Sequence, residues 1–184
     1  TISNPLLKVC DIDACAGIAH EVGARLIIDN TFASPVLCQP LRLGADIVVH
    51  SATKFLGGHA DSLGGVVISR HRADAESLVR VMKLVGGVLS PYEAHQILRG
   101  TKTLAVRMER HCENAAKLAA RLSGNPRIAR VYYPALESAE RKDVAKRILR
   151  EGYFGALVSI ELVDDTRDAA FSFMDALKLC IRST

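Results

Sequence analysis

Short apolar runs alternate with segments of helical periodicity along the first 70 residues, and this rhythm constrains the fold more than any other feature. Residues 12–22 place apolar side chains on one helical face, and residues 25–29 follow as a predicted strand. The pattern repeats through a helical segment at 35–43 and apolar runs at 47–50 and 65–68. Near-continuous apolar strands are typical of strands buried on both faces. We therefore predict an α/β fold with a mainly parallel or mixed sheet and helices outside it.

Two further helices are predicted downstream. Ser90 and Glu93 have the spacing of a capping box, with Pro91 at the first helical position, and we expect Gly100 to close that helix. Apolar residues then follow helical spacing along residues 104–122, until a Ser-Gly-Asn-Pro sequence breaks the pattern. One long helix is therefore expected there.

The pattern changes after this break, because the order becomes strand, helix, strand, helix. Apolar residues alternate with others along 156–162, which predicts a strand with one exposed face. An amphipathic helix is expected at 170–177, with its cap within 164–166. We place a boundary near residue 105 and predict two parts, residues 1–105 and a smaller second layer at 106–184.

Composition and charge exclude several classes of protein. The chain has 184 residues, of which 49% are hydrophobic, and this is enough for a sizeable core. The 24 basic and 20 acidic residues give a net charge of +4 without a long basic block, so we expect no nucleic-acid partner. No apolar run approaches the roughly 20 residues that span a bilayer, so no membrane association is expected.

The cysteines indicate a cellular compartment. The chain contains five of them, an odd number, with no C-x-x-C pair and no zinc-like spacing. Scattered cysteines of this kind are typical of reduced, mostly buried thiols, so we expect a cytoplasmic protein. The chain starts at Thr1 and not at methionine, which leads us to expect a piece of a longer protein.

The chemistry is concentrated where two predicted strands end. Asp29 ends one apolar run and Lys54 follows another, and open α/β sheets bind their ligands at this edge. A carboxylate there can keep the pyridine nitrogen of pyridoxal phosphate protonated, while a lysine can bond covalently to the cofactor and shuttle protons. Ser51 and Thr53 offer hydroxyls to a phosphate, and Gly57 lets the backbone pass close by. We therefore predict a pyridoxal phosphate site.

Simpler interpretations exist for each residue. An aspartate at a strand end is more often a turn former, and a lone lysine is usually a surface residue. The combination of Asp29 with Lys54 and the neighbouring hydroxyls favours the cofactor site. His50, His59 and Asp61 could suggest metal ligands, but no further partner is spaced to complete a site, so we expect no metal and interpret these histidines as structural.

Several strings of residues carry a resemblance to a known family. The chain resembles the Cys/Met metabolism family of pyridoxal phosphate-dependent enzymes over nearly its whole length. That family includes cystathionine γ-synthase, cystathionine β- and γ-lyases, methionine γ-lyase and the O-acetylhomoserine sulfhydrylases. The strings that carry the resemblance are Ser3-Asn4-Pro5, Asp29-Asn30-Thr31-Phe32, Gly44-Ala45-Asp46, Ser51-Ala52-Thr53-Lys54, Gly57-Gly58-His59, Arg99-Gly100-Thr101-Lys102-Thr103-Leu104 and Arg107-Met108.

The resemblance implies a fold and a set of roles. The fold would be the type I, aspartate aminotransferase-like α/β architecture, with residues 1–105 as the second half of the large cofactor-binding domain and 106–184 as the start of the small α+β domain. Lys54 matches the family's Schiff-base lysine, Asp29 its pyridinium partner, and Ser51 and Thr53 its phosphate-binding hydroxyls. Asn4 matches the asparagine that faces the substrate carboxylate. The family's glycine-rich phosphate loop lies upstream of this segment, and its carboxylate-binding arginine lies downstream.

The resemblance also implies an activity. We expect a carbon–sulfur lyase or γ-replacement enzyme of sulfur amino acid metabolism that acts on a small amino-acid substrate, and residues 88–115 look closest to the cystathionine and methionine γ-lyases. The alternatives are cystathionine γ-synthase or an O-acetyl- or O-succinylhomoserine sulfhydrylase. A non-enzyme alternative is a catalytically silent paralogue that acts as an assembly partner. The resemblance further implies self-association as a homodimer or homotetramer.

Overall fold

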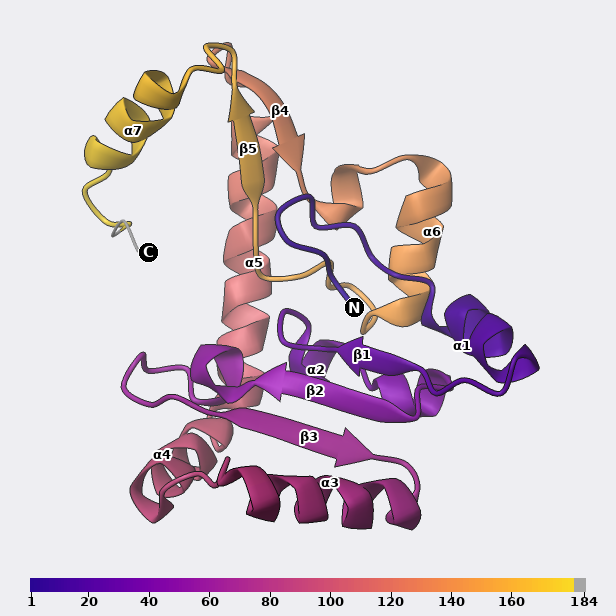
Figure 1. Cartoon of the computed structure of the whole chain (residues 1–184). Coiled ribbons are helices and arrows are strands. Elements are labelled where there is room, and N and C mark those ends of the chain that lie inside the picture. The colour runs from indigo at the N-terminus through magenta and orange to yellow at the C-terminus, as the bar shows by residue number, and fades with distance from the viewer. Residues whose placement is uncertain (181–184) are drawn as a thin grey trace.

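The computed structural model describes residues 1–180 and contains a three-stranded sheet in the order β1-β2-β3 (Figure 1). Strand β1 (Ile27–Asp29) pairs in parallel with β2 (Ile47–Ser51), and β2 pairs antiparallel with β3 (Gly65–Ser69). All three strands lie where the apolar runs predicted them. The mixed sheet is therefore confirmed, and the parallel pair brings the carboxyl ends of β1 and β2 to the same edge.

Helical segments connect the strands. Helix α1 (Ile12–Glu21) precedes β1 as expected, and its amino end is capped by the Asp11 carboxylate. The predicted helical segment before β2 is divided into α2 (Ser34–Leu37) and a 3-10 turn (Pro40–Leu43). A proline disfavours the helical conformation of the residue before it, and this explains why the two pieces are separate.

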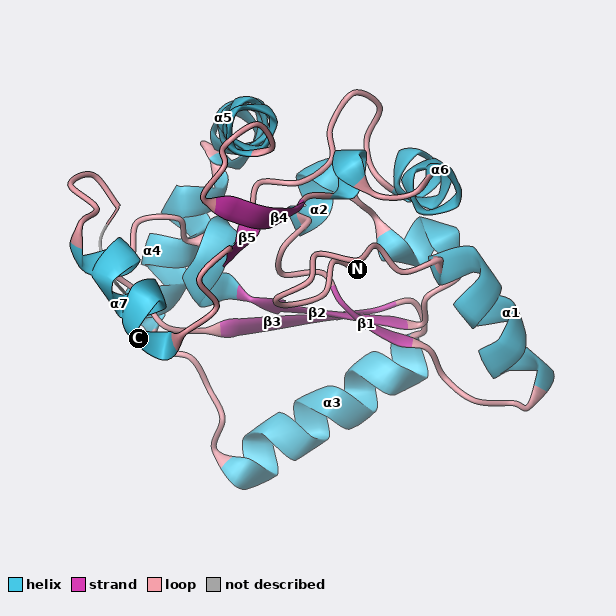
Figure 2. Cartoon of the chain, turned by 90° about the horizontal axis from the view of Figure 1, so that it is seen from above, coloured by secondary structure: helices cyan, strands magenta, loops and turns pink. Residues whose placement is uncertain are grey.

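The sheet is less covered than predicted. Seen from above, α3 (Arg72–Val85) lies on one side of the sheet, and α2, α5 (Leu104–Leu122) and α6 (Ala139–Ile148) lie on the other (Figure 2). Helix α3 has no counterpart among the predicted elements, and it contacts β3 without burying any side chain. Ile27 of β1 and Val67 of β3 remain 56% and 51% exposed. The expectation of strands buried on both faces is therefore wrong for the described residues, since the single helix on this side packs mainly on β3.

Helices α4 (Pro91–Thr101) and α5 (Leu104–Leu122) follow the predicted bounds closely. The Ser90 hydroxyl accepts a hydrogen bond from the Glu93 backbone N–H at 3.2 Å, which confirms the cap. Gly100 does not close α4, because the helix continues to Thr101. Gly100 is buried, and a Cβ atom there would lie 2.1 Å from the carbonyl oxygen of Gly57. The glycine thus permits close packing, and its predicted role as a helix stop is wrong.

A second, two-stranded sheet follows α5. Strand β4 (Ile128–Tyr132) pairs antiparallel with β5 (Ser159–Leu162), with α6 (Ala139–Ile148) between them and α7 (Arg167–Asp175) after them. The predicted order of elements is confirmed. Strand β5 is shorter than the predicted 156–162, because the partner strand ends at Tyr132 and a 3-10 turn (Pro134–Leu136) carries the chain away.

Helix α5 links two hydrophobic clusters. Its first half contributes Leu104, Met108 and Cys112 to a large core shared with α1, β1, β2, α4 and α6. Its second half packs Ala115 and Ala119 into a smaller cluster beneath β4. Because α5 runs through both clusters, the domain boundary near residue 105 stays a prediction.

The cysteines are less buried than expected. Cys38 and Cys112 are buried, Cys10 and Cys15 are half-buried, and Cys180 is exposed; all five are free thiols. Within residues 1–180, no helix combines the length and the apolar character that crossing a membrane requires.

Candidate functional site

The carboxyl ends of β1 and β2 open into one cavity of about 500 Å³. Four of the predicted site residues line it: Asp29, Ser51, Lys54 and Asn4. The volume lies within the range of roughly 300–1,000 Å³ that is typical of sites for small molecules. The prediction that Asp29 and Lys54 lie at the same edge of the sheet is thus confirmed. The other lining residues are Thr1, Ile2, Ser3, Lys8, Cys10, Thr31 and Phe32.

Asp29 is the last residue of β1 and carries a stabilised negative charge. Its Oδ1 atom accepts a hydrogen bond from the Thr31 backbone N–H at 2.9 Å. Burial opposes the charge of the Asp29 carboxylate, but the hydrogen bonding of Thr31 outweighs it and holds the pKa below its usual range. The carboxylate is therefore ionised at neutral pH, which is the form that pairs with a protonated ring nitrogen.

Lys54 lies in a single π-helical turn (Ala52–Leu56) that follows β2 directly. Its own backbone, with φ −84° and ψ −123°, departs from helical geometry. The amino side of the turn is fixed by the Ala52 N–H, which donates to the Gly64 carbonyl at 2.8 Å. The Lys54 side chain lines the cavity and is exposed. The amine is thus open to a covalent partner.

The two predicted phosphate-binding hydroxyls differ in their surroundings. Ser51 ends β2 and lines the cavity, and its hydroxyl has no partner among residues 1–180. Thr53 does not line the cavity; its Oγ1 atom accepts a hydrogen bond from the Gly64 N–H at 3.1 Å. The same hydroxyl donates only a long hydrogen bond to the Gly64 carbonyl oxygen, with 3.5 Å between the two oxygen atoms, so its proton is still available to a better acceptor. The role of Thr53 stays a prediction.

The first ten residues form one wall of the cavity. Ile2 and Val9 form an isolated antiparallel bridge, and the turn between them presents Asn4 and Lys8 to the cavity. Asn4 therefore lines the same cavity as Asp29 and Lys54, and its role toward a substrate carboxylate stays a prediction. Lys8 was not predicted as a site residue, since nothing in its local sequence distinguishes it from a surface lysine.

Thr31 is a second site residue that sequence reasoning did not single out. It lines the cavity, and it contacts both Asp29 and the end of β2. A signal was present in the sequence, because a residue two positions after an aspartate is a common partner in an Asx turn.

His50 is buried behind the site. Its Nδ1 atom has no hydrogen-bond partner among residues 1–180. Burial lowers the pKa of His50, and the charge of Asp29 partly opposes this effect. His50 is therefore neutral at pH 7, which agrees with a structural role.

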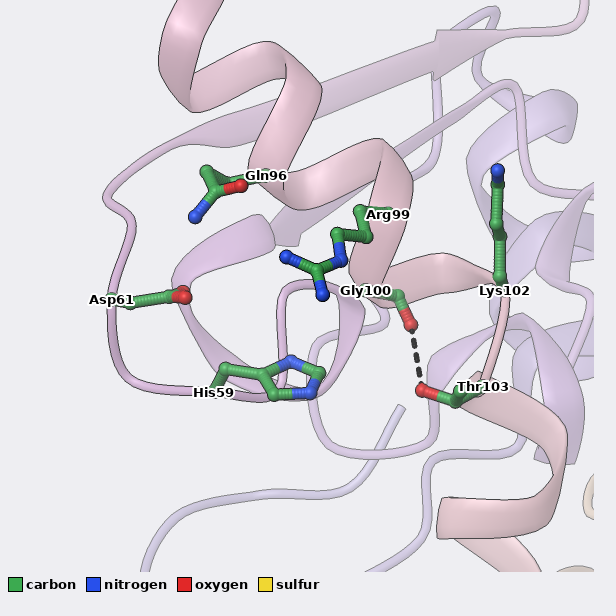
Figure 3. Close-up of a pocket in the computed structure, with 7 residues that line it drawn as sticks. All are labelled: His59, Asp61, Gln96, Arg99, Gly100, Lys102 and Thr103. Carbon is green, nitrogen blue, oxygen red and sulfur yellow. Dashed lines mark hydrogen bonds between the residues drawn. The ribbon is translucent and has the colours of Figure 1, made fainter.

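A second cavity of about 360 Å³ lies between α4 and the loop after the Lys54 turn (Figure 3). Arg99 points toward His59 and Asp61, whereas Lys102 points away from them (Figure 3). Neither Asp29 nor Lys54 lines this cavity. The first cavity suits a pyridine ring with an aldehyde and a phosphate, because the Lys54 amine, the Asp29 carboxylate and the Ser51 hydroxyl all line it. In the second cavity the amine of Lys102 points away from Asp61 (Figure 3).

The whole chain, residues 1–184, matches the model of the family described as Cys/Met metabolism PLP-dependent enzyme. A cystathionine β-lyase from Coxiella burnetii is 47% identical over 167 residues, which are 90% of this chain and 43% of that protein. An L-methionine γ-lyase from Fusobacterium nucleatum subsp. nucleatum is 44% identical over 182 residues, which are 98% of this chain and 45% of that protein.

The fold matches that of solved relatives. The crystal structure of a cystathionine γ-synthase from Xanthomonas oryzae pv. oryzae superimposes with a TM-score of 0.92 and 38% identity, covering 99% of this chain and 46% of that one. The predicted type I, aspartate aminotransferase-like α/β fold is confirmed by this match. The chain spans less than half the length of each of these three proteins.

Proposed function

The chain belongs to the Cys/Met metabolism family of pyridoxal phosphate-dependent enzymes, and we propose that the intact protein is a carbon–sulfur lyase of the cystathionine or methionine γ-lyase type. The observation that supports this proposal most directly is the convergence of Asp29, Ser51 and Lys54 on one cavity. Retention of all three chemical groups argues against the silent-paralogue alternative, which requires none of them.

Each residue has a task in the proposed reaction. Pyridoxal phosphate withdraws electrons from the α-carbon of an amino acid joined to it. Lys54 would hold the cofactor through Nζ, and its free amine would move a proton at the substrate α-carbon. Asp29 holds the ring nitrogen in its protonated form, because its own carboxylate stays ionised. Ser51 and Thr53 hold the phosphate, and the Asn4 amide orients the substrate carboxylate.

Product analysis tests the reaction type. Purified intact protein is supplied with cystathionine or methionine, and thiol, keto acid and ammonia are measured. A γ-lyase releases cysteine and a four-carbon keto acid from cystathionine, whereas a β-lyase releases homocysteine and a three-carbon keto acid. Lys54→Ala is expected to abolish turnover, and Lys117→Ala, at an exposed position on α5, serves as the control. Turnover retained by Lys54→Ala contradicts the proposal.

A γ-replacement enzyme is the second candidate, because the fold matches a cystathionine γ-synthase closely. In both reactions the γ-substituent of the substrate leaves first. A lyase then hydrolyses the remaining unsaturated amino acid to a keto acid and ammonia, whereas a synthase adds a thiol to its γ-carbon. The intact protein is therefore also supplied with an O-acyl homoserine and cysteine. Formation of cystathionine faster than keto acid would support the synthase.

Self-association is the remaining part of the proposal. We expect a homodimer or homotetramer in the cytoplasm. The resemblance to the family supports the assembly, and so do the exposed apolar side chains of α3, among them Val81, Leu84 and Val85. Light scattering coupled to size-exclusion chromatography tests it, and a monomeric mass would contradict it.

A further inference from the structure

The turn that carries Lys54 is held on its far side by Arg107 of α5. Nη1 of Arg107 donates a hydrogen bond to the Phe55 carbonyl at 2.9 Å, and Nη2 donates to the Gly100 carbonyl at 2.8 Å. Nη2 also makes a longer contact of 3.5 Å with the Leu56 carbonyl. The two residues that directly follow Lys54 are thus joined through one guanidinium to the carboxyl end of α4.

The guanidinium is itself fixed in place. Its Nε atom donates to the Thr103 hydroxyl oxygen at 3.0 Å, and this hydroxyl donates to the Gly100 carbonyl at 3.2 Å, a contact drawn in Figure 3. Arg107 is half-buried, and burial lowers its pKa. An arginine nevertheless stays protonated in proteins, so these are charge-assisted hydrogen bonds, which are stronger than neutral ones.

Two glycines permit this close approach. Gly58 has φ +74°, and a Cβ atom there would lie 2.1 Å from Nη1 of Arg107. At Gly100, a Cβ atom would lie equally close, at 2.1 Å, to the carbonyl oxygen of Gly57. A side chain at position 100 would overlap the backbone of Gly57, and one at position 58 would displace the guanidinium of Arg107 from its present place.

We propose, on the basis of the proposed role of Lys54 in binding pyridoxal phosphate, that Arg107 is a positioning residue for Lys54. The amino flank of the turn is fixed by Ala52 and Gly64, and Arg107 fixes the carboxyl flank. Because both ends of the turn are held, the position of the Lys54 Cα atom, from which the side chain extends, is fixed. Covalent binding of the cofactor and proton transfer at the substrate both depend on the position of the Lys54 amine, because a small displacement of a reacting group lowers the reaction rate strongly.

The competing explanation is that Arg107 only joins α5 to the turn. If Arg107 is only a structural link, its replacement lowers the stability of the protein but leaves the rate per bound cofactor unchanged. If Arg107 positions Lys54, its replacement changes the rate even at sites that hold the cofactor. The two explanations are separated by measuring rate per bound cofactor and the pH dependence of the visible band of the bound cofactor.

The test uses the intact protein saturated with pyridoxal phosphate. Arg107→Gln removes the charge and the fork of donors, and Arg107→Lys keeps the charge but replaces the planar fork by one compact ammonium group. Arg110→Gln is the matched control, since Arg110 lies on the same helix and, within the described part of the chain, makes only an exposed ion pair with Glu113. Borohydride trapping on Lys54 is measured first in the wild type, and absence of trapping there contradicts the proposed function itself.

Given trapping in the wild type, we expect Arg107→Gln to lower kcat per bound cofactor by about 10- to 100-fold and to shift the pH midpoint of the visible band. Arg107→Lys should recover part of the rate, and Arg110→Gln should match the wild type. If Arg107→Gln does not fold, Arg107→Lys alone carries the test, with a reduced kcat and a shifted midpoint expected. Wild-type kcat per site together with a wild-type midpoint would overturn the inference.

Discussion

The Thr31 hydroxyl oxygen accepts a hydrogen bond from the backbone N–H of Ser51 at 2.8 Å. The backbone N–H of Thr31 donates at the same time to the Asp29 carboxylate at 2.9 Å. One residue therefore connects the carboxylate at the end of β1 with the end of β2, three residues before Lys54. The relative placement of the two predicted cofactor-binding groups depends on this connection.

Replacement of Thr31 by valine removes the acceptor but keeps the shape of the side chain. The half-buried Ser51 N–H would lose its partner, so we expect a loss of about 1–3 kcal/mol in the free energy of unfolding and weaker binding of pyridoxal phosphate. Thr31→Ser, which keeps the hydroxyl, is the control. Denaturant unfolding and cofactor titration of the intact protein measure both effects, and equal behaviour of the two variants would contradict this account.

Asp29→Asn tests the charge of the carboxylate separately from its shape. The amide oxygen of asparagine can still accept the Thr31 hydrogen bond, so covalent capture of the cofactor on Lys54 should persist. We expect kcat to fall roughly 10²- to 10³-fold, as is typical when one preorganised electrostatic group is removed. Asp61→Asn, in the second cavity, should leave kcat unchanged. Steady-state kinetics at saturating cofactor measure the effect, and an unchanged kcat for Asp29→Asn would exclude the proposed role.

Gly100→Ala should destabilise the protein although alanine favours helices. The new methyl group would overlap the Gly57 carbonyl oxygen, which lies only 2.1 Å from the place a Cβ atom would occupy, and overpacking of this kind costs about 1–3 kcal/mol. Gly17→Ala in α1 is the matched control, because a Cβ atom there meets nothing within 4 Å. It should stabilise the protein by about 0.5–1 kcal/mol. Denaturant unfolding should therefore give changes of opposite sign for the two variants, and stabilisation by Gly100→Ala would contradict the packing argument.

Asp46 predicts a specific dependence of stability on pH. Its buried carboxylate accepts hydrogen bonds from the Leu26 N–H and from His20, each at 2.9 Å, and these hold its pKa at about 2. The pKa in the unfolded chain is higher, about 3.9, so the stabilisation is fully present above that value and is lost as the pH falls toward 2. It amounts to about 2 kcal/mol.

Asp46→Asn should accordingly lower the unfolding temperature at pH 7, and the difference from the wild type should shrink as the pH falls below about 4. Asp143→Asn, which removes an exposed ion pair with Lys146, should change stability little at any pH. Thermal unfolding in a series of buffers measures both variants. If the difference in unfolding temperature between Asp46→Asn and the wild type did not vary with pH, the lowered pKa of Asp46 would be contradicted.

Sequence reasoning located the strands, and placed Asp29 and Lys54 beside one cavity, because the signals for these features are local. Each strand is a short apolar run, and the predicted site residues stand at its carboxyl end: Asp29 ends the first run, and Ser51 and Lys54 follow the second. Helix α3 was missed although apolar residues recur along it at helical spacing, among them Leu78, Val81, Met82 and Val85, so its signal was present in the sequence. Gly100 was misassigned and Arg107 was given no role, because their partners are backbone carbonyls far away in the sequence.

Covalent capture of pyridoxal phosphate tests the central claim most directly. The intact protein is incubated with the cofactor, its visible spectrum is recorded, and the complex is reduced with borohydride, digested and mapped by mass spectrometry. We predict a visible band and a label on the peptide that contains Lys54, with no label there in Lys54→Ala. The absence of a band, or a label confined to another lysine such as Lys8 or Lys102, would contradict the proposed site.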